Sequence, residues 1–368
     1  MEQNRQEIPD QRSDYQHTFS EQQGSTLVDE KQSASGPLSI AELRQQAHDH
    51  MQARRWTQAH AAYERLLAEN DPTADDMLGY AATLDYLGEF ERLHEIAQRV
   101  LERAPDSASG FAYKARSLQK LERISEATIA NDQALLLDMN LGLAWINRSG
   151  LQVLQGKLPE ALRSSQRAVE LTPEDARAWA NKSVALLNFN RLAEALESID
   201  RSIEIDPQNL FSLQIKAEIL TKLGRIHDVV PVVRQALAIH PAHVPALTQA
   251  VRAYRSLEMY QDLQENAALL AQLTPDSLFA WEHYMRALRG LGKFEDANIV
   301  LDRLLEMDGS NVRFWTLKAD TLYRLARYRE AVSAAERATR LDLDYPPAHR
   351  IHDKAIRLMY QKKERRKT

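Results

Sequence analysis

The sequence repeats itself at an interval of 34 residues. The segment AWINRSG at 144–150 returns as AWANKSV at 178–184, so that Trp145 and Trp179 occupy equivalent places. Further steps of 34 residues from Trp145, in both directions, reach only large apolar residues: Leu43, Met77, Phe111, Leu213, Leu247, Trp281 and Trp315. A period held over most of the chain strongly constrains the fold, because it requires one small structural unit stacked many times.

Each unit has the pattern of two helices. Apolar and small residues recur at spacings of three and four, as at 179, 183 and 186 and again at 192, 195, 199 and 202. A glycine often separates the two halves, where a helix needs a left-handed end: Gly88, Gly156, Gly224 and Gly292. A proline closes most units and suits the start of the next helix. Nine such units fill roughly residues 40–345, and they predict an all-α solenoid.

These positions resemble the tetratricopeptide repeat (TPR) family. Its pattern has Trp at the fourth position, a small residue at the eighth, an aromatic residue or Leu at the seventeenth, Ala at the twentieth and Pro near the thirty-second. The segment EDARAWANKSVALLNFNRLAEALESIDRSIEIDP at 174–207 follows it closely. The resemblance implies a right-handed superhelix of helix-turn-helix hairpins. It also implies a concave groove, lined by the first helices, that binds peptides or protein segments.

The predicted organisation has four parts. Residues 1–37 hold seven acids and three bases and few large apolar residues, which is typical of a disordered tail. Residues 38–345 are the repeat units, and 346–360 form an amphipathic C-terminal capping helix. Residues 361–368, QKKERRKT, form a basic tail with two interpretations: a frayed soluble end, or a contact with nucleic acid or anionic lipid.

Composition removes several classes of function. The chain has no cysteine, which excludes disulfides, thiolate metal sites and a cysteine nucleophile. The net charge of −5 is too small to indicate a nucleic-acid partner. The N-terminus has no apolar signal region and no apolar run is long enough to span a membrane, so we expect a cytoplasmic location.

No catalytic, cofactor or metal site is predicted. The repeats occupy nearly every segment past residue 40, and no phosphate-binding Gly-rich loop, GxSxG or HExxH motif is present. Histidines at 48 and 50, 240 and 243, and 349 and 352 are interpreted as surface residues, because the sequence places no acidic third ligand beside them.

Two asparagines are candidates for groove contacts. Asn147 and Asn181 both occupy the sixth position of their units, which faces the groove in the TPR family. They resemble the asparagine ladder in the repeat region of O-linked N-acetylglucosamine transferases. An amide both donates and accepts hydrogen bonds, so such residues can hold the backbone of an extended peptide. The alternative is that they are solvated residues on the helix surface, shared because the two units have a common ancestry.

A basic stripe is the second candidate. It comprises six residues on the C-terminal half of the groove: Lys222, Arg252, Arg255, Arg286, Arg289 and Arg324. Arginine forks bind carboxylates through two hydrogen bonds, so the stripe predicts an acidic protein or peptide partner. The alternative is internal ion pairing with Glu218, Glu282 and Asp320.

The resulting functional hypothesis is a non-catalytic scaffold or adaptor. It would bind an extended or helical, acidic segment of a partner protein in the concave groove. Two alternatives stay open: a docking subunit or diverged relative of a TPR-bearing glycosyltransferase, and a cytoplasmic peptide receptor.

Overall fold

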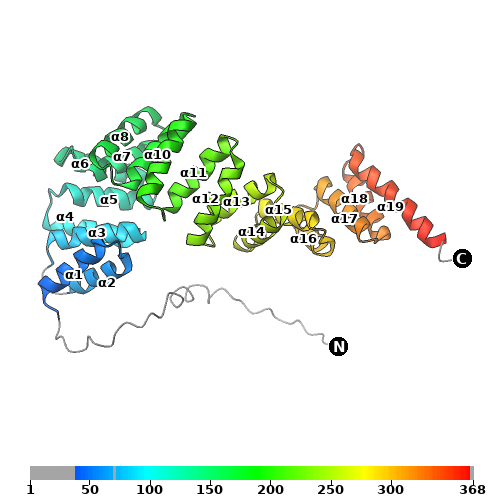
Figure 1. Ribbon diagram of the computed structural model, residues 1–368, viewed down its shortest axis with the longest axis horizontal. Helices are drawn as coiled ribbons and strands as arrows, with labels where there is room; N and C mark the ends of the chain where they lie inside the picture. The colour runs from blue at the N-terminus through cyan, green and yellow to red at the C-terminus, as the bar shows by residue number, and fades with distance from the viewer. Residues whose placement is uncertain (1–37, 69–71, 365–368) are drawn as a thin grey trace.

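The computed structural model describes residues 38–68 and 72–364, and within them every regular element is a helix. Eighteen helices form consecutive hairpins, and a nineteenth follows (Figure 1). The hairpins are α1 (Ile40–Gln52) with α2 (Trp56–Ala68), α3 (Ala74–Leu87) with α4 (Phe90–Arg103), α5 (Ala108–Lys120) with α6 (Ile124–Leu137), α7 (Gly142–Leu154) with α8 (Leu158–Leu171), α9 (Ala176–Asn188) with α10 (Leu192–Ile205), α11 (Leu210–Lys222) with α12 (Ile226–Ile239), α13 (Val244–Ser256) with α14 (Tyr260–Leu273), α15 (Leu278–Gly290) with α16 (Phe294–Met307), and α17 (Val312–Arg324) with α18 (Tyr328–Leu341). The predicted all-α solenoid is confirmed.

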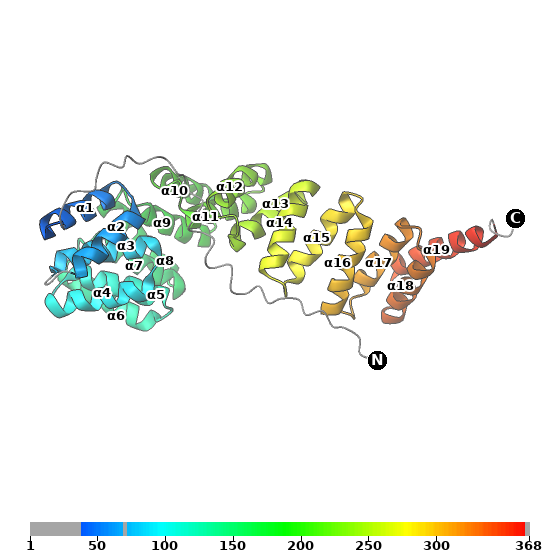
Figure 2. The same ribbon diagram turned by 90° about the horizontal axis from the view of Figure 1, so that it is seen from below.

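The odd-numbered helices lie on the inner side of the array. Each of them from α1 to α13 packs against the next odd-numbered helix as well as against its sequence neighbours, and no pair of even-numbered helices in the described part is packed as closely. Helices on the inside of a curved stack approach one another more closely than those outside. The stack curls tightly over α1–α10 and then extends through α11–α19 (Figures 1 and 2).

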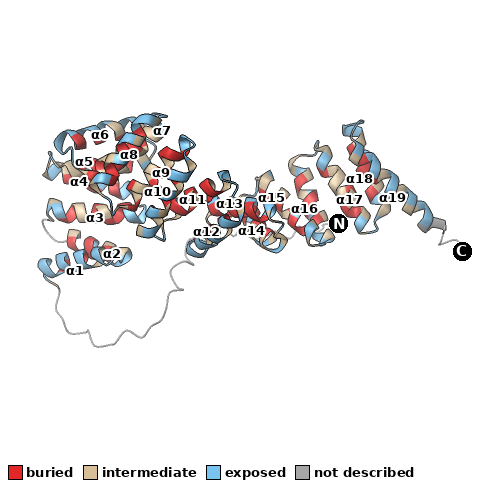
Figure 3. Cartoon of the chain, turned by 45° about the horizontal axis from the view of Figure 1, so that its top comes forward, coloured by how far each residue is buried: buried red, intermediate tan, exposed pale blue. Residues whose placement is uncertain are grey.

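The predicted small and bulky positions form the core. Residues at the eighth position, such as Ala47, Ala115 and Ser183, have no exposed surface. Ala127 and Ala195, at the twentieth position, are equally buried. Figure 3 shows the buried residues between the helices along the whole stack. Small side chains let neighbouring helices approach, and the larger residues of the next helix fill the remaining space.

The recurring tryptophans also tie the loops to the helices. The indole Nε1 of Trp145 donates to the Met139 carbonyl at 2.8 Å, and that of Trp179 donates to the Pro173 carbonyl at 2.8 Å. Trp281 makes the equivalent bond to the residue six places before it. Each bond joins the helix to the turn that precedes it. Tryptophan at this position therefore packs between helices and also fixes the direction in which the chain enters the helix.

A left-handed residue separates the two helices of every hairpin. Four are the predicted glycines, and five carry side chains at φ between 54° and 60°: Arg54, Glu122, Asn190, Glu258 and Ala326. A Cβ atom in this conformation costs about 1–2 kcal/mol, and asparagine tolerates it best. Ala326 therefore carries strain that Gly292, one unit earlier, avoids.

The substitution Ala326→Gly is expected to raise the free energy of unfolding by about 0.5 kcal/mol. Relief of the left-handed strain exceeds the extra entropy that glycine gives the unfolded chain. The urea midpoint measures this change. Gly292→Ala is the matched control and is expected to lower the midpoint, because a Cβ there meets no atom within 4 Å and only the conformation opposes it. A lower midpoint for Ala326→Gly would contradict the argument.

The last helix, α19 (Pro346–Glu364), covers the end of the array (Figure 1). Ile351 and Ala355 pack with Ala319, Leu322 and Ala335 of the final hairpin. The helix continues past residue 360, its predicted end. The expected disordered tail at 1–37 and the final residues 365–368 of the basic tail lie outside the described residues.

Candidate functional site

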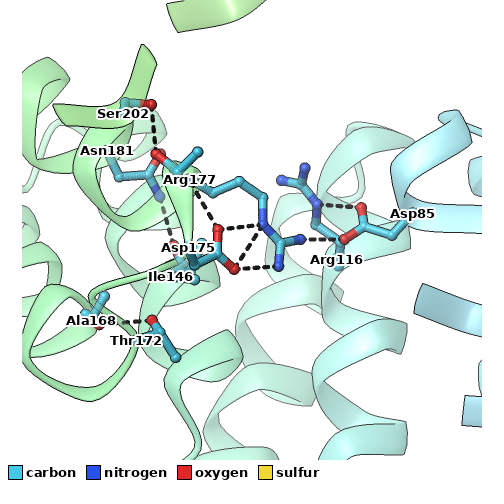
Figure 4. Close-up of polar contacts among 10 residues, drawn as sticks. Asp85, Arg116, Ile146, Ala168, Thr172, Asp175, Arg177, Asn181 and Ser202 are labelled. Carbon is cyan, nitrogen blue, oxygen red and sulfur yellow. Dashed lines mark hydrogen bonds and ion pairs between the residues drawn. The ribbon is translucent and has the colours of Figure 1, made fainter. Parts of the chain in front are cut away.

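The tight N-terminal turn is closed by an ion-pair network on its inner side (Figure 4). Asp85 of α3 accepts from Arg116 Nε of α5 at 2.8 Å and from Arg177 Nη1 of α9 at 2.5 Å. Arg177 is held in turn by Asp175, whose Oδ2 lies 2.7 Å from Nη2. Asp85 and Arg177 are 92 residues apart in the sequence, so this contact links distant units across the turn.

Burial and the neighbouring positive charges shift the pKa of Asp85 in opposite directions. Its side chain is only 4% exposed, and burial alone would raise the pKa of the carboxyl group. The positive charges of Arg116 and Arg177 outweigh burial and hold that pKa below its usual range. Beside the network, burial raises the pKa of Tyr113 to about 12. The Asp85 carboxylate is therefore ionised, and both of its oxygens accept hydrogen bonds from the protein's own arginines.

A second contact crosses the same turn. Arg54, in the α1–α2 connection, donates from Nη1 to the carbonyl of Ile205 at the end of α10, at 3.2 Å. Together with the Asp85 network, it bridges the curl of α1–α10 with side chains of the protein itself. A partner segment would have to displace these contacts to lie there.

In the structure, Asn147 and Asn181 each donate a hydrogen bond to the preceding unit. Asn147 is 1% exposed, and its Nδ2 donates to the Ala112 carbonyl of the preceding unit at 2.8 Å. Asn181 Nδ2 donates at 2.9 Å to the Ile146 carbonyl and to Ser149 Oγ. The repeated Asn-basic-Ser pattern thus links successive first helices, because the amide of one unit reaches the serine of the unit before it. We leave both asparagines out of the proposed binding surface.

Half of the basic stripe is paired with the protein's own carboxylates. Lys222 lies 3.9 Å from Glu218. Arg289 and Arg324 both bond Asp320, and Arg289 also donates to a backbone carbonyl and to a threonine hydroxyl of α17. The internal-pairing alternative therefore describes these three cations. Glu282 pairs instead with Arg313, which is not a member of the stripe.

The other half is exposed and has no carboxylate partner among the described residues. We call Arg252, Arg255 and Arg286 the arginine cluster. Arg252 and Arg255 lie one turn apart on α13, and Arg286 occupies on α15 the place that Arg252 has on α13. The guanidinium of Arg252 lies over the ring of Phe279, 5.5 Å from its centre. The cluster thus presents three free guanidinium groups from two neighbouring inner helices.

Two further residues, His283 and Gln249, were not singled out from the sequence. His283 is 7% exposed, its Nδ1 lies 2.7 Å from the Phe279 carbonyl, and its Nε2 is buried without a partner among the described residues. Gln249 Oε1 is likewise buried and unpaired in that part of the chain. Both occupy the sixth position of their units, next to the arginine cluster. Their position was visible in the sequence, but their burial was not.

The pKa of His283 is lowered mainly by burial. The positive charges of Arg255 and Arg286 lower it further, against the opposing effects of the Phe279 carbonyl and Glu282. The ring is therefore held neutral in the free protein near neutral pH.

Other kinds of site find little support. A hollow of about 520 Å³ lies between α8, α9 and the start of α10. Most of the charged groups that line it are in ion pairs, such as Arg167–Glu170 and Arg191–Glu194. Within residues 38–68 and 72–364, no group of three or more His, Asp or Glu residues could hold a metal ion. No helix in these ranges is long and apolar enough to cross a bilayer.

The sequence matches the tetratricopeptide repeat family over residues 152–209 and 286–350. These two segments are tetratricopeptide repeats. No curated protein matches the chain. Repeats of this family suggest a scaffold for protein–protein interaction, and the fold is typically not catalytic.

Solved structures share the fold at low identity. A chain of the APC/C hetero-tetramer Cut9–Hcn1 is 14% identical with a TM-score of 0.51, and the match covers 81% of this chain and 59% of that chain. PilF of Pseudomonas aeruginosa is 20% identical with a TM-score of 0.48, covering 57% of this chain and 95% of PilF. A thermophilic TPR protein of Thermus thermophilus is 19% identical with a TM-score of 0.43, covering 50% and 100%. The likeness to the Cut9–Hcn1 chain, at 14% identity, concerns the fold alone.

Proposed function

We propose that this TPR protein is a non-catalytic scaffold that binds an acidic segment of a partner protein on the inner surface of its C-terminal half. The observation that carries the proposal is the arginine cluster. Its three members lie exposed on neighbouring inner helices without a carboxylate of their own in the described part, whereas Lys222, Arg289 and Arg324 are already paired.

The physical argument rests on uncompensated charge. Three like charges on adjacent helices repel one another, and a bound carboxylate relieves that repulsion while accepting strong hydrogen bonds. Packing against Phe279 gives the Arg252 side chain a defined direction and reduces the entropy lost on binding. The ligand that fits is an extended or helical segment with successive acidic side chains.

In this proposal the N-terminal half supports the structure and does not bind the partner. Its inner side is closed by the Asp85 network, so it holds the first turn rigid and leaves binding to α11–α17. A cytoplasmic location remains a prediction. The glycosyltransferase-docking and peptide-receptor alternatives also remain predictions, and no contact in the described residues favours either of them.

Reversing two charges of the cluster tests the proposal. The double variant Arg252→Glu/Arg286→Glu is expected to weaken binding of a blocked hexaglutamate peptide by about 100-fold, since each lost charged hydrogen bond contributes about 1.5–3 kcal/mol. Fluorescence anisotropy at low salt measures the affinity. Crosslinking in the native host, with wild type and variant side by side, then identifies the natural partner.

The control is a double variant with the same change in net charge. Arg99 on α4 and Arg329 on α18 are exposed on outer helices, so Arg99→Glu/Arg329→Glu alters the overall charge equally without touching the cluster. We expect this control to weaken binding less than about threefold, because distant exposed charges are screened. Equal affinity of the cluster variant and the wild type would reject the assignment of the surface.

A further inference from the structure

Arg255 and Arg286 of the arginine cluster lie near His283, whose Nε2 has no partner among the described residues. The Phe279 carbonyl can only accept, so the 2.7 Å contact assigns the proton of the neutral ring to Nδ1 of His283. Nε2 is then a buried lone pair, and Gln249 Oε1 on the neighbouring inner helix is a second buried acceptor. Other buried acceptors among the described residues, such as Asn147 Oδ1, also lack a partner. These two differ because they lie on adjacent helices beside three exposed arginines, and this combination indicates a place for a ligand.

The charges that act on the ring come from two helices. α13 contributes Arg255, and α15 contributes Arg286 and Glu282. Glu282 is held by Arg313, with Oε1 2.8 Å from the guanidinium. α14 and α16 also pack against α15, and none of the largest charge effects on His283 comes from a residue of these two helices.

We propose that His283 is a proton-linked anchor for the acidic segment. A carboxylate of the segment lies between Arg255 and Arg286 and accepts a hydrogen bond from Nε2–H of the imidazolium, and the ring takes the required proton from the solvent on binding. Gln249 Oε1 accepts a backbone N–H of the same segment. This inference rests on the proposed function, and it adds that recognition is coupled to pH.

The coupling follows from which charges face the ring. In the free protein, the two arginines and burial disfavour the imidazolium. A bound carboxylate supplies the missing negative charge and an acceptor for Nε2–H, so it raises the pKa of His283. Binding then tightens as the pH falls through the pKa of the bound state, and it levels off below the pKa of the free state. A ligand that only donates hydrogen bonds would bind the neutral ring without taking up a proton.

Calorimetry of the full chain with the blocked hexaglutamate peptide tests the inference. Titrations near pH 6 in two buffers of different ionisation enthalpy measure the protons taken up, and we expect uptake approaching one proton per peptide. Affinity is expected to be about tenfold tighter near pH 6 than near pH 8, which is within the tenfold per pH unit that one linked proton allows. This measurement on the wild type requires no variant to fold.

Two histidine variants test whether the proton taken up on peptide binding goes to His283. His283→Gln is expected to bind the peptide without that proton uptake and with nearly the same affinity at both pH values. His227, exposed on the outer helix α12, provides the matched control His227→Gln, which should behave as wild type. No peptide binding at either pH would overturn the proposed function. Binding without proton uptake, or uptake that persists in His283→Gln, would overturn this inference alone.

Discussion

The substitution Asp85→Asn is expected to lower the free energy of unfolding of the N-terminal turn by about 3 kcal/mol. Asparagine has nearly the same size as aspartate, so the packing survives while the negative charge is lost. Arg116 and Arg177 then face each other in a largely buried place without the carboxylate that bridges them. Breaking a buried ion pair by removing one partner costs about 3–5 kcal/mol, and we take the lower end because Asp175 still holds Arg177.

The loss should be local and should change the shape of the protein. Asp85 joins α3 to α9 across the turn, so the variant loses a contact that holds the curl of α1–α10. Hydrogen exchange is expected to increase in α3, α5 and α9, and small-angle scattering should show a larger radius of gyration. Unchanged exchange in α3 and α9 would mean that the network does not hold the turn.

An exposed ion pair supplies the control. Asp228 lies 2.7 Å from Arg225, a separation similar to those in the Asp85 network, but both side chains are at least half exposed. Asp228→Asn is therefore expected to cost less than about 1 kcal/mol. The comparison separates the effect of burial from the effect of ion pairing itself.

The pH dependence of the Asp85→Asn effect identifies its origin. The folded-state pKa of Asp85 is lowered, so its contribution to stability is complete above the unfolded value of about 3.9 and is lost as the pH falls through the folded-state pKa. The difference between wild type and variant should be constant from about pH 5 to 8 and shrink below about pH 4. A difference that grows as the pH falls would contradict an ionic origin.

The substitution Tyr254→Ala is expected to lower local stability by about 3–5 kcal/mol, the range for deleting a large buried aromatic side chain. Tyr254 is 1% exposed and is among the largest fully buried side chains. It belongs to a cluster with Leu220 of α11 and Leu263 of α14, so it joins α13 to the helices on both sides. Because it lies between Arg252 and Arg255 on the same helix, its loss should also weaken binding of the acidic peptide.

Hydrogen exchange measures where this loss occurs. In a solenoid each unit contacts only its neighbours, so protection should fall in α12–α15 and stay unchanged in α1–α6. Tyr360→Ala is the control, because Tyr360 is 57% exposed on α19 and its removal should cost less than about 0.5 kcal/mol. A uniform loss of protection over all helices after Tyr254→Ala would show that the array unfolds as one cooperative unit.

Local sequence patterns were enough to predict the helices and their phase. The spacing of Trp145 and Trp179 predicted hairpins every 34 residues, and the first helices indeed begin at that interval from Ile40 to Val312. Caps, left-handed glycines and apolar periodicity act over a few residues, so they can be recognised without knowledge of distant contacts. The six cations of the stripe were also visible, because position within a repeat indicates the face of the helix.

The packing between units determines which of these residues are paired within the protein and which remain available to a ligand. Whether Arg289 reaches Asp320, or whether Asn147 meets a carbonyl of the preceding unit, depends on how closely successive units approach. The pairing of Asp85 with Arg177 depends on the accumulated curvature of several units, and no local pattern encodes it. The burial of His283 has the same origin. Helix formation is governed by neighbours in sequence, whereas burial and ion pairing are set by rotations between units that add up along the solenoid.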